Sequence, residues 1–168
     1  AIPYQSYKLI NNKEILPFEK VWYDVWKNID NLTIREQITI TTYIVNYINP
    51  DFTPAYIVRG DAYFTNKDYI NALQDYTIAI EQQPNNAEIY YKRGLTYNYL
   101  KDFYPNAIND FKQATDLNNN IANFWAEYSY ALKFSHYGAD EMLAKAIAIN
   151  PQYKNFNYNE LEQQRTTI

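Results

Sequence analysis

The sequence predicts an all-α protein, a solenoid in which helical hairpins stack one behind another. Three observations lead to this fold class. A pattern of about 34 residues occurs twice in succession in the middle of the chain. Each copy holds two stretches in which apolar or small residues recur every three or four positions, the period of a helix face. With 47% hydrophobic and 20% charged residues, the composition is that of a folded domain.

The repeat emerges when residues 53–86 are placed over residues 87–121. In the first half of the unit, all matched pairs have the same separation in the sequence. In the second half, the two residues of each pair lie one position further apart. The matched pairs are Tyr56/Tyr90, Arg59/Arg93, Gly60/Gly94 and Tyr63/Tyr97, then Ala72/Ala107, Asp75/Asp110, Tyr76/Phe111 and Ala79/Ala114. The extra residue falls near Tyr104-Pro105, between the two predicted helices, where a repeat tolerates insertion.

Each unit is expected to form a helical hairpin. In residues 53–86 the first helix presents Tyr56, Gly60 and Tyr63 on one face. A polar break follows, in which Asp68 is expected to cap the second helix. Pro84 ends the unit, because the residue before a proline disfavours helix.

These residues resemble a known family. The series Tyr56-x3-Gly60-x2-Tyr63, Ala72-x3-Tyr76-x2-Ala79 and Pro84 is similar to the tetratricopeptide repeat over its full length. Residues 87–121 resemble it everywhere except at the terminal proline, where Asn119 stands. The resemblance implies a right-handed α-solenoid of such hairpins that binds other proteins.

The flanking segments resemble the family less. Residues 19–52 fit a degenerate unit with Trp26 at a small-residue position and Ile38 in place of an alanine. Residues 122–153 fit another, whose loop near 135–138 is short. End repeats are commonly modified as caps. We therefore expect about four units, preceded by an irregular arm at 1–18 and followed by a C-terminal cap helix and tail at 154–168.

The composition excludes several kinds of chemistry. Without cysteine the chain has no thiol nucleophile or zinc–cysteine site, and His136 is its only histidine. The formal charge of −4, with basic residues scattered among acidic ones, argues against a nucleic-acid surface. No apolar stretch approaches the roughly 20 residues that span a bilayer. We expect no enzymatic activity, catalytic residue, cofactor or metal site.

Two charged pairs recur at fixed positions of the repeat. Arg59 and Asp75 return as Arg93 and Asp110, and both positions change together in the outer units. We interpret each pair as a structural ion pair between the two helices of its hairpin. Partly buried pairs of this kind specify geometry more than they stabilise.

The family resemblance also assigns a binding surface. In this family the first helices line a concave groove that binds peptides. Carried over position by position, the groove residues of this chain are Tyr23, Lys27, Ile57, Asp61, Phe64, Tyr91, Leu95, Asn98, Tyr99, Tyr130 and Phe134. Exposed aromatic patches rimmed by polar groups mark interaction sites. Asn98 is expected to bond the ligand's amides, and Phe64, Tyr91 and Tyr99 to hold its apolar anchors.

One subtype of groove is not expected. Family members that bind chaperones hold a C-terminal carboxylate with Lys, Asn and Arg side chains. The corresponding positions here are Tyr23, Lys27, Val58, Asn123 and Glu127. Only Lys27 has the expected character, so a clamp of the Hsp70/Hsp90 type is disfavoured.

We therefore expect a non-enzymatic scaffold that binds a peptide segment of a partner protein. A secretion-type chaperone or assembly factor holding an apolar client is one alternative, and a non-catalytic module of a larger enzyme complex is another. The N-terminal arm or C-terminal helix of the same molecule, or a second copy in a homodimer, could instead fill the groove. The sequence starts at Ala1, which leaves open both a removed leader and a longer parent chain, and cytoplasmic and exported locations both stay open.

Overall fold

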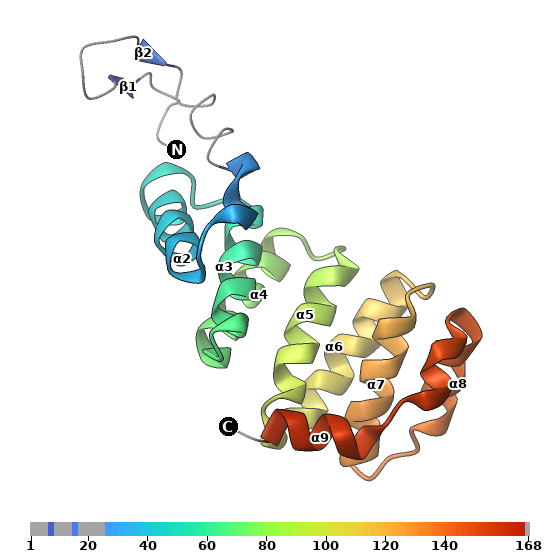
Figure 1. Ribbon diagram of the computed structural model, residues 1–168. Coiled ribbons are helices and arrows are strands. Elements are labelled where there is room, and N and C mark those ends of the chain that lie inside the picture. The colour runs from blue at the N-terminus through green and yellow to red at the C-terminus, as the bar shows by residue number, and fades with distance from the viewer. Residues whose placement is uncertain (1–6, 9–14, 17–25, 167–168) are drawn as a thin grey trace.

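The computed structural model describes residues 7–8, 15–16 and 26–166, and most of them belong to a row of helices (Figure 1). The helices are α2 (Ile34–Tyr43), α3 (Thr53–Thr65), α4 (Tyr69–Gln82), α5 (Ala87–Asn98), α6 (Tyr104–Leu117), α7 (Ala122–Phe134), α8 (Asp140–Ile149) and α9 (Tyr158–Thr166). Shorter helical turns are η1 (Ile29–Asn31), the π-helical η2 (Ile44–Ile48), η3 (Lys101–Phe103) and η4 (Pro151–Asn155).

The helices stack in sequence order. The hairpins α3–α4, α5–α6 and α7–α8 follow one another, and the second helix of each hairpin packs against the first helix of the next. Helix α2, continued by η2, packs against α3 at the N-terminal end. The predicted all-α solenoid with a C-terminal cap helix is confirmed (Figure 1).

The arm at residues 1–18 contains a short regular element. Strands β1 (Tyr7–Lys8) and β2 (Ile15–Leu16) pair antiparallel, with Tyr7 opposite Leu16 and Lys8 opposite Ile15. For these four residues the prediction of an irregular arm was wrong, because backbone pairing supplies order without a long apolar pattern. The other positions of the arm lie outside the described residues, as does Tyr23.

Side-chain caps fix where several helices begin. The hydroxyl of Thr33 accepts from the backbone N–H of Glu36 at 3.3 Å, and the Glu36 carboxylate accepts from the backbone N–H of Thr33 at 2.9 Å, which is a capping box for α2. Asp68 caps α4 as predicted by accepting from the N–H of Asn71. Asn86 caps α5 by accepting from the N–H of Glu88 at 3.1 Å.

The inserted residue of the second repeat is absorbed between α5 and α6. The turn η3 occupies this connection, and α6 begins at Tyr104 with Pro105 in its first turn, where no backbone N–H is needed. The turn points Phe103 outward, so this ring is 42% exposed and stacks on Tyr97 at 5.9 Å. The ring therefore lies at the surface and not in the core between the helices.

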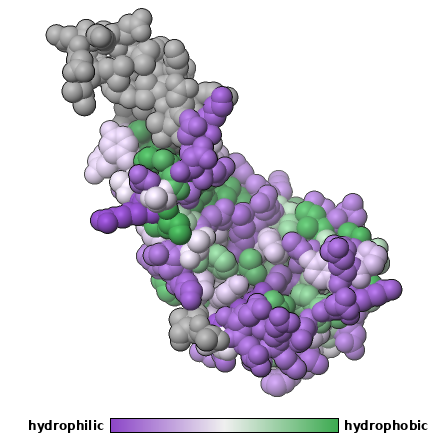
Figure 2. All heavy atoms as spheres, in the orientation of Figure 1, coloured by the Kyte–Doolittle hydropathy of each residue, from purple (hydrophilic) through white to green (hydrophobic). Residues whose placement is uncertain are grey.

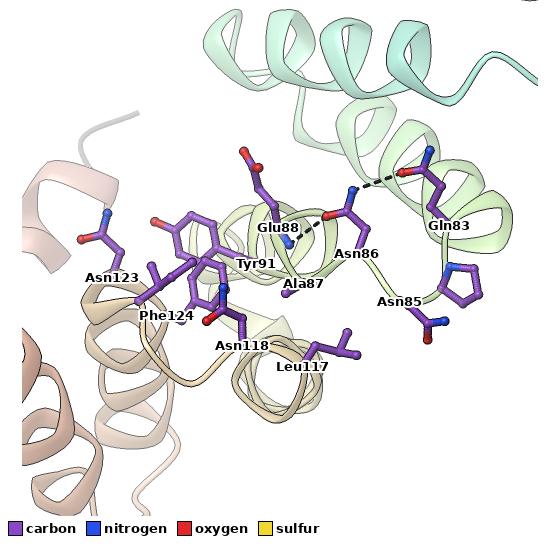
Figure 3. Close-up of a pocket in the computed structure, with 12 residues that line it drawn as sticks. Gln83, Asn85, Asn86, Ala87, Glu88, Tyr91, Leu117, Asn118, Asn123 and Phe124 are labelled. Atoms are coloured by element: carbon purple, nitrogen blue, oxygen red, sulfur yellow. Dashed lines mark hydrogen bonds between the residues drawn. The ribbon is translucent and has the colours of Figure 1, made fainter.

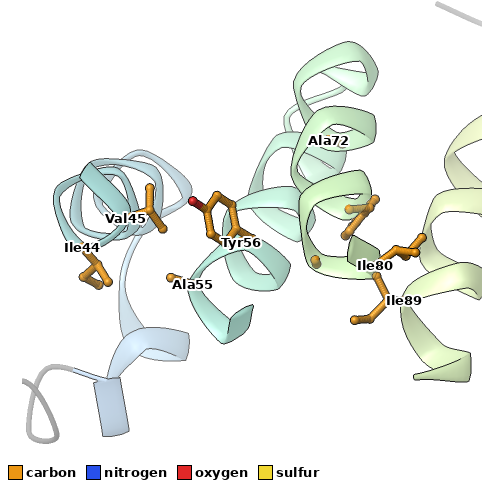
Figure 4. Packing of buried hydrophobic residues seen from close by; sticks show 9 residues of the cluster. Ile44, Val45, Ala55, Tyr56, Ala72, Ile80 and Ile89 are labelled. Carbon is orange, nitrogen blue, oxygen red and sulfur yellow. The ribbon is translucent and has the colours of Figure 1, made fainter. Parts of the chain in front are cut away.

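Small residues let the helices of each hairpin approach closely. The larger core cluster runs from η2 to α5 and contains Ile44, Val45, Ala55, Tyr56, Ala72, Tyr76, Ala79, Ile80 and Ile89 (Figure 4). At Gly60 an added Cβ would lie 2.7 Å from Cε1 of Tyr76. The repeated glycine is therefore required by packing against the ring at the following aromatic position.

The two repeated arginines each connect three helices. Nε and Nη2 of Arg59 donate to both carboxylate oxygens of Asp75 at 2.8 and 2.7 Å, and Nη1 donates to Thr42 of the preceding helical unit at 3.1 Å. Arg93 makes the same contacts with Asp110 and with Thr77 of the preceding hairpin. Burial raises the pKa of both carboxyl groups, and the arginines oppose that rise. The pairs therefore fix the spacing within and between hairpins.

Candidate functional site: the first-helix face

Helices α3, α5 and α7 are the first helices of their hairpins, and the side of the solenoid that they form is called here the first-helix face. Several predicted groove residues on it serve the core. Ile57 and Phe64 pack against the larger core cluster, and Leu95 packs against a smaller one formed by Ala107, Phe111 and Ala131. Lys27 is exposed at the N-terminal end of the described helices.

The carboxylate of Asp61 is already paired. It accepts from the hydroxyl of Tyr76 at 2.6 Å and from Nζ of Lys92, on the neighbouring α5, at 2.9 Å. Aromatic rings beside it form a continuous layer, in which Phe64 meets Tyr99 edge to face at 5.0 Å. This part of the face is held together by contacts between α3 and α5.

Helix α9 lies across α5 and α7 on the first-helix face (Figure 1). At its start the hydroxyl of Tyr158 donates to Oγ of Ser129 at 3.2 Å. Near its end Nη2 of Arg165 donates to Oε1 of Glu127 at 2.7 Å. Hydrophilic side chains cover its outer side (Figure 2). The C-terminal helix of the same chain therefore fills part of the predicted groove.

The Arg165 guanidinium sits between two tyrosine rings. Its Cζ lies 4.9 Å from the ring centroid of Tyr99 and 4.2 Å from that of Tyr130. Only 6% of the Arg165 side chain is exposed. Burial acts to lower the pKa of Arg165, but the charge and hydrogen bond of Glu127 outweigh it and raise the pKa. Arg165 is therefore a buried, charged anchor. We call Tyr99, Glu127 and Tyr130 the arginine cage.

Two predicted ligand contacts are corrected by this arrangement. Asn98 is 1% exposed, and its Nδ2 donates to the backbone carbonyl and to Oε2 of Glu127 at 3.1 and 2.9 Å. Asn98 therefore orients Glu127 and does not bond a ligand's amides. Tyr130 is fully buried, and burial raises the pKa of its hydroxyl. Its ring lies 4.6 Å from that of Phe134, which is half-buried.

An open hollow of about 890 Å³ lies at the N-terminal ends of α5 and α7 (Figure 3). The loops that precede these two helices form its walls. Amide side chains and apolar groups alternate around it: Gln83, Pro84, Asn85, Asn86, Ala87, Glu88, Tyr91, Leu117, Asn118, Ile121, Asn123 and Phe124. Among its lining residues only Glu88 is charged.

The base of this hollow is aromatic and rigid. Tyr91 stacks on Phe124 with ring centroids 4.8 Å apart and also contacts Phe111. Burial raises the pKa of the Tyr91 hydroxyl, so the group is neutral and can donate a hydrogen bond at physiological pH. The exposed side chain of Asn123 accepts from the hydroxyl of Tyr153 in η4. Of the residues predicted for the groove, Tyr91 is the one that lines this hollow.

The described residues offer little for chemistry. No group of three or more His, Cys, Asp or Glu side chains that could hold a metal ion occurs among them. Within the same part of the chain, the helices are too short or too polar to cross a bilayer.

The role of Arg165 was not predicted from the sequence. Glu127 was considered only as one position of the Hsp70/Hsp90-type clamp, which was not expected here. The available signal was the spacing of Tyr158, Leu161 and Arg165, which places the three on one face of a helix. Nothing in the sequence fixed where that face would pack.

Family models match the two central hairpins. One described as TPR repeat matches residues 60–98, and one described as tetratricopeptide repeat matches residues 87–121. A segment of 72 residues is 32% identical to Superkiller complex protein 3 of Mus musculus. That segment is 43% of this chain and only 4% of the mouse protein.

Solved structures share the fold at low identity. A MamA protein aligns with a TM-score of 0.70 at 18% identity, covering 83% of this chain and 76% of MamA. The first TPR domain of Spaghetti (RPAP3), bound to an HSP90 peptide, aligns with a TM-score of 0.58 at 19% identity, covering 68% of this chain and 90% of the domain. The TPR2B domain of yeast Sti1, in complex with Hsp70, gives a TM-score of 0.54 at 24% identity over 67% of this chain and 91% of that one. Residues 60–121 therefore match tetratricopeptide repeats, and the stacked helical hairpins have the solenoid fold of such repeats.

Proposed function

We propose that this chain is a non-catalytic interaction scaffold that binds a peptide segment of a partner protein on its first-helix face. The observation that carries the proposal is the open hollow at the N-terminal ends of α5 and α7. Its amide side chains suit the N–H and C=O groups of an extended peptide, and Tyr91 offers an aromatic surface for an apolar anchor. Two proteins of similar fold are bound to peptides from Hsp90 and Hsp70.

The ligand we propose differs from a chaperone C-terminus. At one position that would have to bind a carboxylate stands Glu127, whose own carboxylate is paired with Arg165. A second carboxylate beside it would be repelled. We therefore propose that the ligand is an internal segment of the partner chain and not a C-terminal carboxylate. Its backbone N–H and C=O groups would bond the amide side chains of the hollow, and one apolar side chain would serve as the anchor.

A client-holding chaperone is a weaker candidate on the same surface. Such a protein needs a broad apolar groove, whereas five of the residues lining this hollow are Asn or Gln. A role as a module within a larger complex is compatible with the scaffold proposal, because the same surface would then bind a neighbouring subunit.

The test is affinity capture from extracts of the source cells with matched variants. Tyr91→Ala removes the anchor surface, Asn123→Asp places a charge at the rim of the hollow, and Tyr137→Ala removes a 67% exposed ring from the loop after α7. We expect one partner to be lost from both hollow variants and retained by Tyr137→Ala, with helicity unchanged by circular dichroism. Equal retention by all variants would refute binding at the hollow. Asn123→Asp keeps the test valid should Tyr91→Ala misfold.

A further inference from the structure

The arginine cage is built from groups that recognise a guanidinium. Tyr99 and Tyr130 present their rings to the cation within 4.9 Å, which is favourable cation–π geometry. Glu127 supplies the opposite charge, with its Oε1 placed 2.7 Å from Nη2. Two hydrogen bonds from Asn98 hold Glu127 in this position. Glu127 and Tyr130 belong to α7 and Tyr99 directly follows α5, so the cage components are present without α9.

The charge balance of the face favours a basic ligand at this point. Asp61 is neutralised by Lys92, whereas among the described residues the cation paired with Glu127 is Arg165 alone. Without α9, Glu127 would be a half-buried carboxylate with no cation beside it. A planar guanidinium fits between two rings and a carboxylate better than the ammonium of a lysine.

Helix α9 is weakly held for an element that fills a binding surface. It has nine residues, and an isolated helix shorter than about 12 residues is marginal in water. It makes far fewer close approaches to the solenoid than the paired helices make to one another. Within the described part of the chain, Nε and Nη1 of Arg165 have no hydrogen-bond acceptor. The guanidinium of α9 is therefore only partly hydrogen-bonded in the cage. A partner segment whose arginine is better paired there could replace α9.

We propose that the arginine cage is a binding site for the arginine side chain of a helical partner segment, and that α9 occupies it as a built-in competitor. This rests on the proposed function, because the same first-helix face carries both sites. A partner that fills the hollow and also presents an arginine to the cage would displace α9. Partners without that arginine would compete poorly with it.

The test uses a fluorescein-labelled peptide with the sequence of residues 156–168 and the full chain as receptor, read by fluorescence anisotropy. The Arg165→Ala chain loses its internal anchor, so the peptide should bind it at least about 10-fold more tightly than it binds the wild-type chain. Arg35→Ala removes an exposed arginine of α2 and should behave as the wild type. Should Arg165→Ala lose helicity by circular dichroism, Arg165→Lys replaces it, with a smaller gain expected.

Peptide and cage variants define the chemistry. In the Arg165→Ala chain, a peptide with Arg165→Lys should bind at least about 10-fold more weakly than the native peptide. Adding Glu127→Gln to the receptor should weaken binding by a similar factor, whereas Glu81→Gln, on the exposed side of α4, should leave it unchanged. Equal binding of the arginine and lysine peptides, or equal affinity of the wild-type and Arg165→Ala chains, would overturn the proposal.

Failure of this proposal is distinguishable from failure of the proposed function. The capture experiment changes Tyr91 and Asn123, and neither residue is part of the arginine cage. A partner lost from those variants, together with a peptide that does not bind the folded Arg165→Ala chain, would leave the hollow as the binding site and α9 as a fixed cap.

Discussion

Removing Arg59 alone should destabilise the protein more than removing Arg59 together with Asp75. The pair has two charge-assisted hydrogen bonds of 2.8 and 2.7 Å, and the side chain of Asp75 is only 4% exposed. Arg59→Leu leaves that carboxylate buried without its partner, because solvent does not reach it. Breaking a buried pair from one side costs about 3–5 kcal/mol of unfolding free energy.

The double variant Arg59→Leu/Asp75→Leu removes the charge along with its partner. Replacing a buried pair with apolar groups of similar volume is often close to neutral, so we expect the double variant within about 1 kcal/mol of the wild type. A small loss remains, because Thr42 loses the hydrogen bond from Nη1 of Arg59. The coupling between the two single changes should therefore be about 3 kcal/mol or more.

Urea unfolding at pH 7, followed by circular dichroism, measures the four corners of this cycle. Arg93 and Asp110 have the same geometry one repeat later and provide an independent second cycle. Arg35→Leu changes an exposed arginine and should alter stability by less than about 0.5 kcal/mol. Additive losses in both cycles would refute the view that each arginine chiefly compensates its buried carboxylate.

Three further predictions concern packing, capping and the number of repeats. Gly60→Ala should lower the free energy of unfolding in urea by about 1–3 kcal/mol, because its Cβ would lie 2.7 Å from the Tyr76 ring. Gly138→Ala has open space around it and should cost almost nothing. Equal losses from the two changes would contradict the role of Gly60 in packing. Hydrogen bonds from the side chain and backbone of the N-cap threonine of α2 lower the pKa of Glu36 below 4.5. The ionised Glu36 side chain therefore stabilises the folded protein above that pH, and this stabilisation is lost as the pH falls through the lowered pKa. The difference in Tm between wild type and Glu36→Gln should therefore be larger at pH 7 than at pH 3, and a constant difference would contradict it. A fragment of residues 53–121 holds only two hairpins and should show low helicity and a broad melt; full helicity with a cooperative transition would count against stabilisation by neighbouring units.

The fold was predictable because the residues that determine it contact near neighbours in the sequence and recur in each repeat. Gly60 and Gly94 recur where the following aromatic ring must fit, and Arg59 recurs with Asp75 as Arg93 recurs with Asp110. Such positions contact residues of the same or the adjacent hairpin, so one period of sequence contains most of the information.

The site was less predictable because it depends on a contact across the stack. The position of Arg165 between Tyr99 and Tyr130 joins α9 to α5 and α7, and no repeat position encodes it. The family pattern assigned Asn98 and Tyr130 to an open groove, yet both are buried. The outward turn of Phe103 has a similar origin, since a single inserted residue changes the local backbone without changing the repeat.

Site-specific photo-crosslinking from the first-helix face would show directly whether a partner binds in the hollow. A benzophenone amino acid at Asn123 would stand at the exposed rim of the hollow, and the same group at Gln74 would stand on the exposed surface of the second helix α4. If partners bind in the hollow, the partner isolated by capture should form a covalent adduct from position 123 and none from position 74. An adduct from position 74 alone would place binding on the second helices and refute binding in the hollow.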